Sequence, residues 1–223
     1  MTVLRGEGTT EIIYGSASIP AGPETLGGYI ARPDREGDWP TVLVFGPEPT
    51  PTSAVKALCW RMARHGIAAV APDMTPEHGA NRQIALQVAA FVSSENSGWS
   101  NAHLGYGVIA LGPGIYDAAG LAADDARAVA LATVGANLDA LVTDDLATAG
   151  VPVLYIGSRS DGTVDIDMSV EARDEIPRTG YAIYADTKTR WWDIEADNYE
   201  EDMAMDTFDR FVGFFGEQLP VRT

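Results

Sequence analysis

The sequence predicts an α/β fold in which a mostly parallel central sheet is covered by helices on both faces. Short apolar segments alternate along the chain with segments of helical periodicity. One of them, residues 104–111, is apolar enough for a central strand that is buried on both faces. No repeat or linker divides the 223 residues. We therefore expect one domain over residues 1–223, with residues 1–24 as an N-terminal strand or extension.

Seven segments have the composition of strands. They are residues 27–33, 41–46, 67–73, 104–111, 126–135, 151–157 and 180–186. In open α/β sheets ligands bind at the carboxyl ends of the strands. Functional residues are therefore expected directly after Gly46, Leu111, Gly157 and Asp186.

Helical periodicity marks the segments between the strands. Apolar residues recur every three or four positions in residues 53–66, 81–92 and 204–219. In residues 108–122, "VIALGPGIYDAAGLA", a strand, a sharp glycine turn and a further helix follow one another. The turn Leu111-Gly112-Pro113-Gly114 is called the elbow below.

The chain is strongly acidic, with a formal net charge of -17. Such a surface repels nucleic acids and anionic membranes, so neither is an expected partner. The acidic residues concentrate after Asp124, and a solvated acidic face is favoured over a cation site. Salt adaptation and a high-GC genome both explain this composition.

The remaining composition favours a soluble cytoplasmic protein without a cofactor. The N-terminus has no apolar signal region, and no apolar run reaches the roughly 18 residues of a membrane helix. The single cysteine, Cys59, lies in a helical apolar stripe, so we expect a buried, inert thiol. Three scattered histidines favour no metal site, and no glycine motif follows a strand to bind a cofactor. Adjacent carboxylates such as Asp124 and Asp125 are expected to be solvated.

Several segments together resemble the dienelactone hydrolase-like branch of the α/β-hydrolase fold, over about residues 25–219. The N-terminal half is similar in "GGYIARP", "WPTVLVFG" and "ALCWRMARHGIAAVAPDM". "GVIALGPG" stands at the place of the family's nucleophile elbow, "VPVLYIGSRSDGTV" at the acid loop, and "YAIYADTKTRWW" at the histidine loop. The resemblance implies an α/β-hydrolase fold and a hydrolase ancestry for esters or lactones.

At the catalytic positions of this family's pattern, this chain has different residues. Gly112 stands at the nucleophile position, with Ala110 at the first glycine of the pattern and Gly114 at the last. Pro113 stands at the residue that should donate its N–H to the oxyanion, and proline has no N–H. In the family pattern Y-x-x-x-x-H-x-F, Thr189 takes the place of the histidine. The resemblance thus implies vestigial nucleophile and base positions.

Two further positions of the family pattern, the acid and the loop after the strand 41–46, each have more than one interpretation. Asp161 begins "DGTV", as the family's acid does, but its spacing from Gly157 lets Ser160 compete for the position. Asp161 is either the acid or a loop carboxylate. After the strand 41–46 the chain continues Gly46-Pro47-Glu48, where Glu48 is a displaced candidate for the family's glutamate.

Aromatic residues follow two of the expected strand ends. Tyr116 comes after the elbow, and Trp191 and Trp192 follow the strand 180–186. These rings either line an apolar cleft or fill the vacated site.

We therefore expect a protein that has lost ester and lactone hydrolysis and binds a ligand or a partner. The expected partners are a small molecule in the former cleft and a homo- or hetero-oligomer. One alternative is an active hydrolase of small esters or lactones that uses Glu48, Asp161 and a water molecule. Another is a structural subunit that pairs with an active paralogue.

Overall fold

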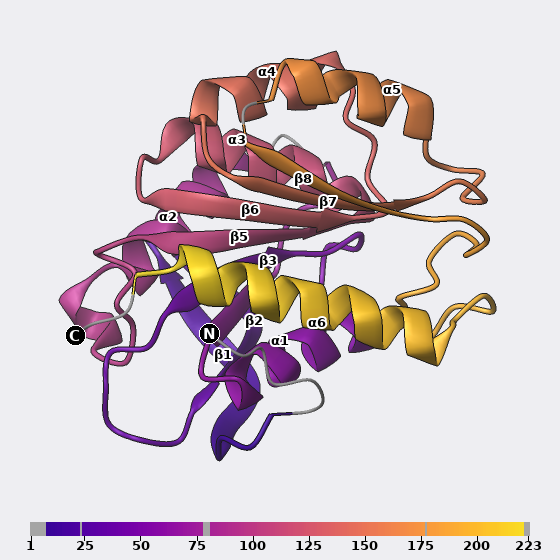
Figure 1. Cartoon of the computed structure of the whole chain (residues 1–223). Coiled ribbons are helices and arrows are strands. Elements are labelled where there is room, and N and C mark those ends of the chain that lie inside the picture. The colour runs from indigo at the N-terminus through magenta and orange to yellow at the C-terminus, as the bar shows by residue number, and fades with distance from the viewer. Residues whose placement is uncertain (1–7, 23, 78–80, 177, 221–223) are drawn as a thin grey trace.

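Eight strands form the centre of the computed structural model, which describes residues 8–22, 24–77, 81–176 and 178–220 (Figure 1). The strands are β1 (Ile12–Ala21), β2 (Glu24–Pro33), β3 (Thr41–Phe45), β4 (Ala68–Pro72), β5 (Tyr106–Leu111), β6 (Ala128–Val134), β7 (Val153–Ser158) and β8 (Thr179–Tyr184). All seven predicted strands are present, although their ends are shifted from the predicted ones. The N-terminal segment contributes the eighth, β1.

The strands form one sheet in the order β1-β2-β4-β3-β5-β6-β7-β8. The first three strands in this order pair antiparallel, and all other neighbours pair parallel. The carboxyl ends of β3, β5, β6, β7 and β8 therefore meet at one edge of the sheet. The β5 strand lies in the middle and is buried along its whole length, as its apolar sequence predicts.

Helices cover both faces of the sheet (Figure 1). They are α1 (Ser53–Arg64), α2 (Arg82–Val92), α3 (Ile115–Asp124), α4 (Ala140–Ala149), α5 (Ile166–Glu171) and α6 (Glu201–Gln218). One core cluster packs α1 and α6 against one face, and a second packs α2, α3, α4 and α5 against the other. Cys59 is buried in the first of these layers, and burial raises the pKa of its thiol, so it is an unreactive core residue.

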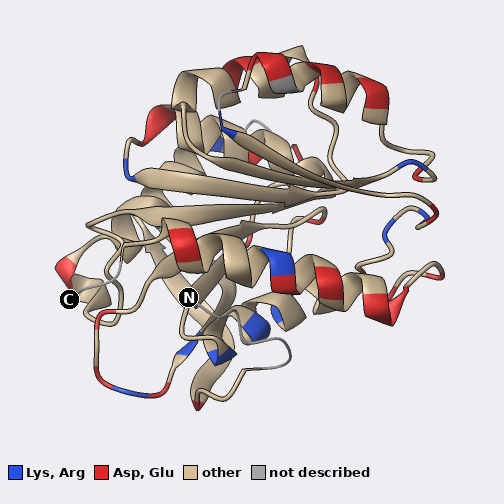
Figure 2. Cartoon of the chain, in the orientation of Figure 1, with Lys and Arg blue, Asp and Glu red and all other residues tan. Residues whose placement is uncertain are grey.

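Acidic residues gather on the outer surfaces of α4, α5 and α6, whereas basic residues are conspicuous on α1 (Figure 2). This distribution agrees with the solvated acidic surface that the composition predicts. Among the described residues, no helix has the length and apolar character needed to cross a membrane.

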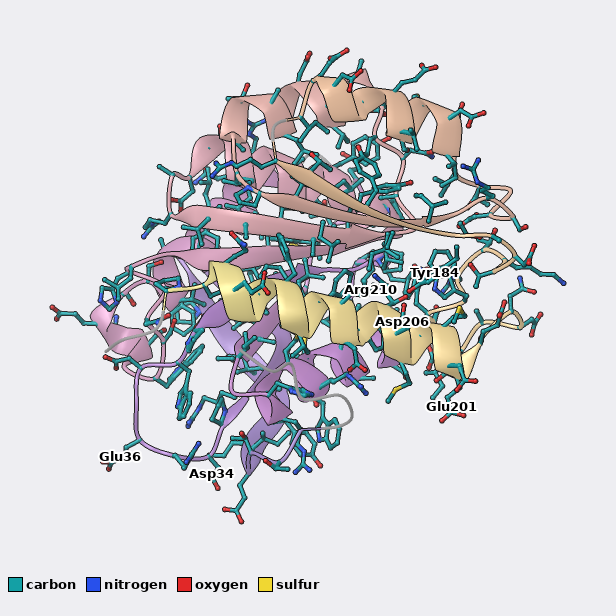
Figure 3. The ribbon with its side chains drawn as sticks, in the orientation of Figure 1. Asp34, Glu36, Tyr184, Glu201, Asp206 and Arg210 are labelled. Atoms are coloured by element: carbon teal, nitrogen blue, oxygen red, sulfur yellow. The ribbon has the colours of Figure 1, made fainter. Side chains whose placement is uncertain are left out.

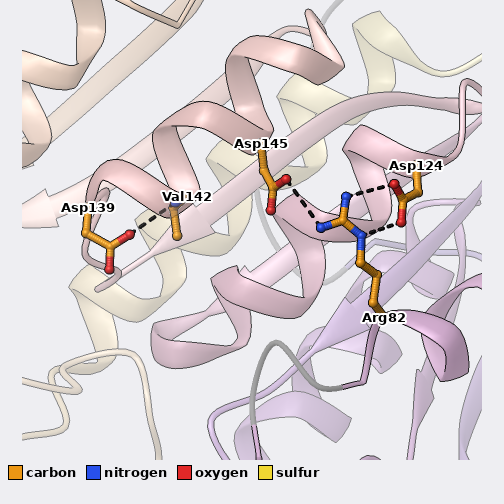
Figure 4. Close-up of polar contacts among 5 residues, drawn as sticks. All are labelled: Arg82, Asp124, Asp139, Val142 and Asp145. Atoms are coloured by element: carbon orange, nitrogen blue, oxygen red, sulfur yellow. Dashed lines mark hydrogen bonds and ion pairs between the residues drawn. The ribbon is translucent and has the colours of Figure 1, made fainter.

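Asp124 at the end of α3 is exposed but ion-paired with Arg82 (Figure 4), whereas Asp125 is buried, which corrects the expectation that both carboxylates are solvated. Arg82 of α2 pairs with Asp124 through two nitrogens, and its third nitrogen lies 3.4 Å from Asp145 of α4. Asp125 is buried and accepts hydrogen bonds from Arg127. Arg82 therefore links three helices on one face of the sheet.

Replacing Arg82 with Gln is expected to lower the free energy of unfolding by up to about 1 kcal/mol, because the side chain is 40% exposed and solvent screens the pairs. Hydrogen bonding to Arg82 lowers the pKa of Asp124, so this contribution is present above about pH 4 and is lost as the pH falls through the lowered pKa. Urea denaturation at several pH values and salt concentrations measures it. An effect that is as large at about 1 M salt as at low salt would contradict it.

Candidate functional site

The strand ends that carry the predicted site residues surround one small pocket. Its volume is about 280 Å³. It is called the elbow pocket and is lined by Pro47, Glu48, Gly112, Pro113, Gly135, Asp161, Thr163, Thr189, Arg190 and Trp192. Seven of these ten residues were predicted from the sequence.

Gly112 has the backbone geometry of a nucleophile elbow. It is buried at the end of β5, and its φ of +56° lies in the left-handed region. A Cβ at this position would lie 3.8 Å from the carbonyl oxygen of Gly135 and 3.9 Å from Cβ of Pro47, so there is room for a side chain. Glycine adopts this left-handed conformation without the steric cost that a side chain would add.

Gly114 explains why the turn remains rich in glycine. A Cβ there would lie 2.4 Å from the carbonyl oxygen of Phe45, which is a backbone atom. The close approach of the elbow to the end of β3 therefore requires glycine at this position.

Two prolines, Pro47 and Pro113, lie beside Gly112 in the elbow pocket. Oxyanion donors in this fold are the N–H after the nucleophile and an N–H from the loop after β3. Pro113 occupies the first of these positions, and Pro47 of the β3 loop lies beside Gly112. Neither residue has an N–H to donate.

Asp161 and Thr189 form a hydrogen-bonded pair, in the relation that an acid and a base would have. Thr189 Oγ1 donates to Asp161 Oδ1 at 2.7 Å. The same carboxylate oxygen accepts from the Thr163 hydroxyl at 2.7 Å and from the Thr163 N–H at 3.0 Å. Asp161 is buried, whereas Ser160 points elsewhere and donates to the carbonyl of Ala185. Of the two acid candidates, only Asp161 therefore faces the elbow pocket.

The wall opposite the elbow is made by Arg190 and Trp192. Arg190 has a φ of +61°, an uncommon backbone conformation for this residue type. Its guanidinium pairs with the fully buried Asp193. Trp192 is 2% exposed, and its indole Nε1 has no hydrogen-bond partner among the described residues.

Three predicted pocket residues lie elsewhere. Trp191 is fully buried in the core beneath α6, so it does not line the pocket as Trp192 does. Gly46 packs against α1, where a Cβ would lie 2.7 Å from Val55. Tyr116 lines a neighbouring open pocket, where its hydroxyl donates to Asp139 at 2.7 Å and this bond raises the pKa of Tyr116 to about 12.

A polar network ties Trp191 and β8 to α6, and Figure 3 shows three of its members, Tyr184, Asp206 and Arg210. The Tyr184 hydroxyl donates to Asp206, which also accepts from Arg210 at 2.7 Å. Trp191 Nε1 donates to the Thr207 hydroxyl at 3.2 Å, and its ring meets that of Tyr184 edge-on. These contacts fix the loop that carries Thr189 and Trp192.

Three lining residues were not predicted, namely Gly135, Thr163 and Arg190. A signal for Gly135 was present, because it ends the predicted strand 126–135 at the same edge as the other strand ends. Thr163 and Arg190 carry no sequence signal for this position.

The elbow pocket has few groups suited to covalent chemistry. None of its described lining residues is a serine, cysteine or histidine. The described part of the chain also holds no group of three or more His, Cys, Asp or Glu residues able to bind a metal ion. What the pocket does offer is two carboxylates, two hydroxyls, one paired guanidinium and one indole N–H.

Comparisons with known proteins identify the fold. No protein-family model matches the chain, and no curated protein matches it. A solved structure of a candidate dienelactone hydrolase from Klebsiella pneumoniae is 20% identical with a TM-score of 0.74, and the match covers 93% of this chain and 99% of that one. A dienelactone hydrolase-like promiscuous phosphotriesterase from metagenomic libraries is 15% identical with a TM-score of 0.78, and the match covers 94% and 99%.

A dienelactone hydrolase from Anabaena variabilis gives a TM-score of 0.71 at 16% identity, and the match covers 94% and 99% of the two chains. Both chains are thus covered almost completely in each comparison. The chain has the α/β-hydrolase fold in the form found in dienelactone hydrolase-like proteins.

Proposed function

We propose that this protein binds a small molecule in the elbow pocket and does not hydrolyse esters or lactones. The single observation that carries the proposal is the Thr189–Asp161 hydrogen bond beside Gly112. This bond supports the proposal because threonine is not a base near neutral pH and Gly112 has no nucleophilic side chain.

The proposed absence of a nucleophile, a base and an oxyanion donor forms one consistent set. A triad hydrolase needs a nucleophile, a base and oxyanion donors at convergent positions. Here those positions hold Gly112, Thr189 and Pro113, while the elbow geometry itself is kept. The pocket volume of about 280 Å³ is just below the roughly 300–1,000 Å³ that is typical of ligand sites, so the pocket suits only a small ligand.

One observation favours the alternative, an active hydrolase with unusual residues. Glu48 and Asp161 line the same pocket, so either carboxylate is placed to accept a proton from a water molecule. In that case Asp161→Asn would abolish the activity if Asp161 is the base, and Glu48→Gln would abolish it if Glu48 is the base. The Thr163→Val variant is the matched control, because it removes one hydroxyl contact to Asp161 and keeps the carboxylate.

Steady-state hydrolysis of a panel of activated esters and a dienelactone tests the proposal. We expect wild type and Asp161→Asn to give the same rate as buffer, at low salt and at multi-molar salt. A kcat/KM of ordinary enzyme size for wild type, about 10⁴ M⁻¹s⁻¹ or more, would overturn the proposal. Size-exclusion chromatography in the same buffers tests whether the chain acts as a subunit of a larger assembly.

A further inference from the structure

The outer edge of β1 carries backbone groups that no described residue satisfies. The Asp34 N–H donates to the Glu11 carbonyl at 2.8 Å, so Glu11 and every second residue after it point their N–H and C=O toward β2. The residues between them point these groups away from the sheet, namely Ile12, Tyr14, Ser16 and Ser18. None of these outward groups has a backbone hydrogen bond to another described residue.

This row of outward groups has a defined length and a defined centre. On one side it stops at Thr10, whose N–H donates to the Arg64 carbonyl at 3.1 Å. On the other side it stops at Pro20, which has no N–H. The row is therefore centred on Gly15. Because it is symmetric about one residue, it fits an antiparallel copy of itself across a two-fold axis.

The strand lacks most of the devices that keep a sheet edge from pairing. Edge strands are usually protected by short length, charged side chains, bulges or proline. β1 has ten residues without a charged side chain, its register with β2 is regular, and its one proline, Pro20, lies near its end. Ile13 and Tyr14 are 45% and 59% exposed and add apolar surface on the two faces of the strand. Such an edge favours pairing with another strand.

The charge distribution indicates which partner fits this edge. The chain has a net charge of -17, and acidic residues gather on α4, α5 and α6 (Figure 2), so a basic partner would be attracted to those helices. Two copies of the chain repel each other where their acidic surfaces meet. Pairing through β1 instead places an uncharged strand of one copy against an uncharged strand of the other.

We propose that two copies of this chain form a dimer by antiparallel pairing of their β1 edges, with the two-fold axis at Gly15. In this register Tyr14 of one copy lies opposite Ser16 of the other, and Ile12 lies opposite Ser18, and each of these pairs exchanges two hydrogen bonds. The two Gly15 residues form a non-hydrogen-bonded pair, in which the Cα atoms are about 4.5 Å apart. The inference is independent of the proposed function, because it uses no residue of the elbow pocket.

Sedimentation equilibrium of the full chain, from micromolar to millimolar concentration, tests the dimer. We expect wild type to approach twice the chain mass of 23.7 kDa. Ser16→Pro should weaken association at least about a hundredfold, because each copy loses one N–H donor and its ring meets the facing strand. The Ser16 N–H points away from β2, so proline removes no hydrogen bond of the single copy. Ser16→Ala keeps the N–H and is the matched control, and circular dichroism checks that both variants fold.

Disulfide cross-linking tests the register. Gly15→Cys should form a disulfide-linked dimer on mild oxidation, since the two side chains meet at the axis and a Cβ at this position has no atom within 4 Å in the single copy. Ser18→Cys is the control, because the two copies of residue 18 would be roughly 20 Å apart, too far for a disulfide. Cys59 is buried, so wild type should form no cross-link.

A wild type that stays monomeric at all concentrations would overturn the proposal. Hydrogen exchange then distinguishes the reasons: slow exchange of the Tyr14 and Ser16 N–H would mean that another segment of the same chain covers the edge, and fast exchange would mean that the edge stays open. A dimer that Ser16→Pro leaves intact would overturn the assignment of the interface to β1. Cross-linking of Ser18→Cys in place of Gly15→Cys would overturn the axis at Gly15.

Discussion

The triple variant Gly112→Ser, Pro113→Ala, Thr189→His is expected to hydrolyse activated esters that wild type leaves intact. A serine at position 112 would adopt the left-handed conformation that Gly112 already has, with its Cβ 3.8 Å or more from the surrounding residues. The strain of a non-glycine residue there is about 1–3 kcal/mol, which a stable fold tolerates.

The other two changes restore the groups that a serine needs. Thr189 already contacts Asp161, so a histidine at this position is placed to pair with the same carboxylate. A positioned base contributes roughly 10²–10⁴-fold in rate. Pro113→Ala returns an oxyanion N–H, and loss of one such donor typically costs about 10²–10³-fold.

The matched control is Gly112→Ala, Pro113→Ala, Thr189→His, which carries the same backbone strain without the hydroxyl. Initial rates with a p-nitrophenyl ester compare the two. We expect the serine variant to exceed the alanine variant at least about a hundredfold. Equal rates would mean that Gly112 is not the nucleophile position of the ancestral site.

Trp191→Ala is expected to lower the free energy of unfolding by about 3–5 kcal/mol. The side chain is fully buried between β8 and α6, and truncation would leave a cavity and remove the hydrogen bond to the Thr207 hydroxyl. Urea denaturation measures the change.

Leu141→Ala is the control for Trp191, because Leu141 is 60% exposed and its loss should change stability by no more than about 0.5 kcal/mol. A change below about 1 kcal/mol for Trp191→Ala would contradict the core position of this ring.

The sheet and the elbow were predictable because they depend on local patterns. Uninterrupted apolar runs predict buried parallel strands, and the glycines at positions 112 and 114 predict a sharp turn directly after one of them. Strands therefore appeared at the right places, and their ends led to Gly112, Asp161 and Thr189.

The orientation of side chains in loops was not predictable. Trp191 and Trp192 are adjacent and chemically identical, yet one enters the core and the other lines the pocket. No periodicity applies in a loop whose conformation depends on Arg190 and the buried Asp193. The burial of Asp125 was missed for a related reason, since it depends on the nearby Arg127 rather than on helical position.

The measurement that tests the proposed absence of catalysis most directly is product release from wild type under excess substrate. Wild type and Asp161→Asn are incubated for hours with a many-fold excess of an activated ester, and the product is counted per mole of protein. We expect both to release no more product than buffer alone. Release of many equivalents by wild type, abolished by Asp161→Asn, would contradict the loss of catalysis and establish an active hydrolase with an unusual site.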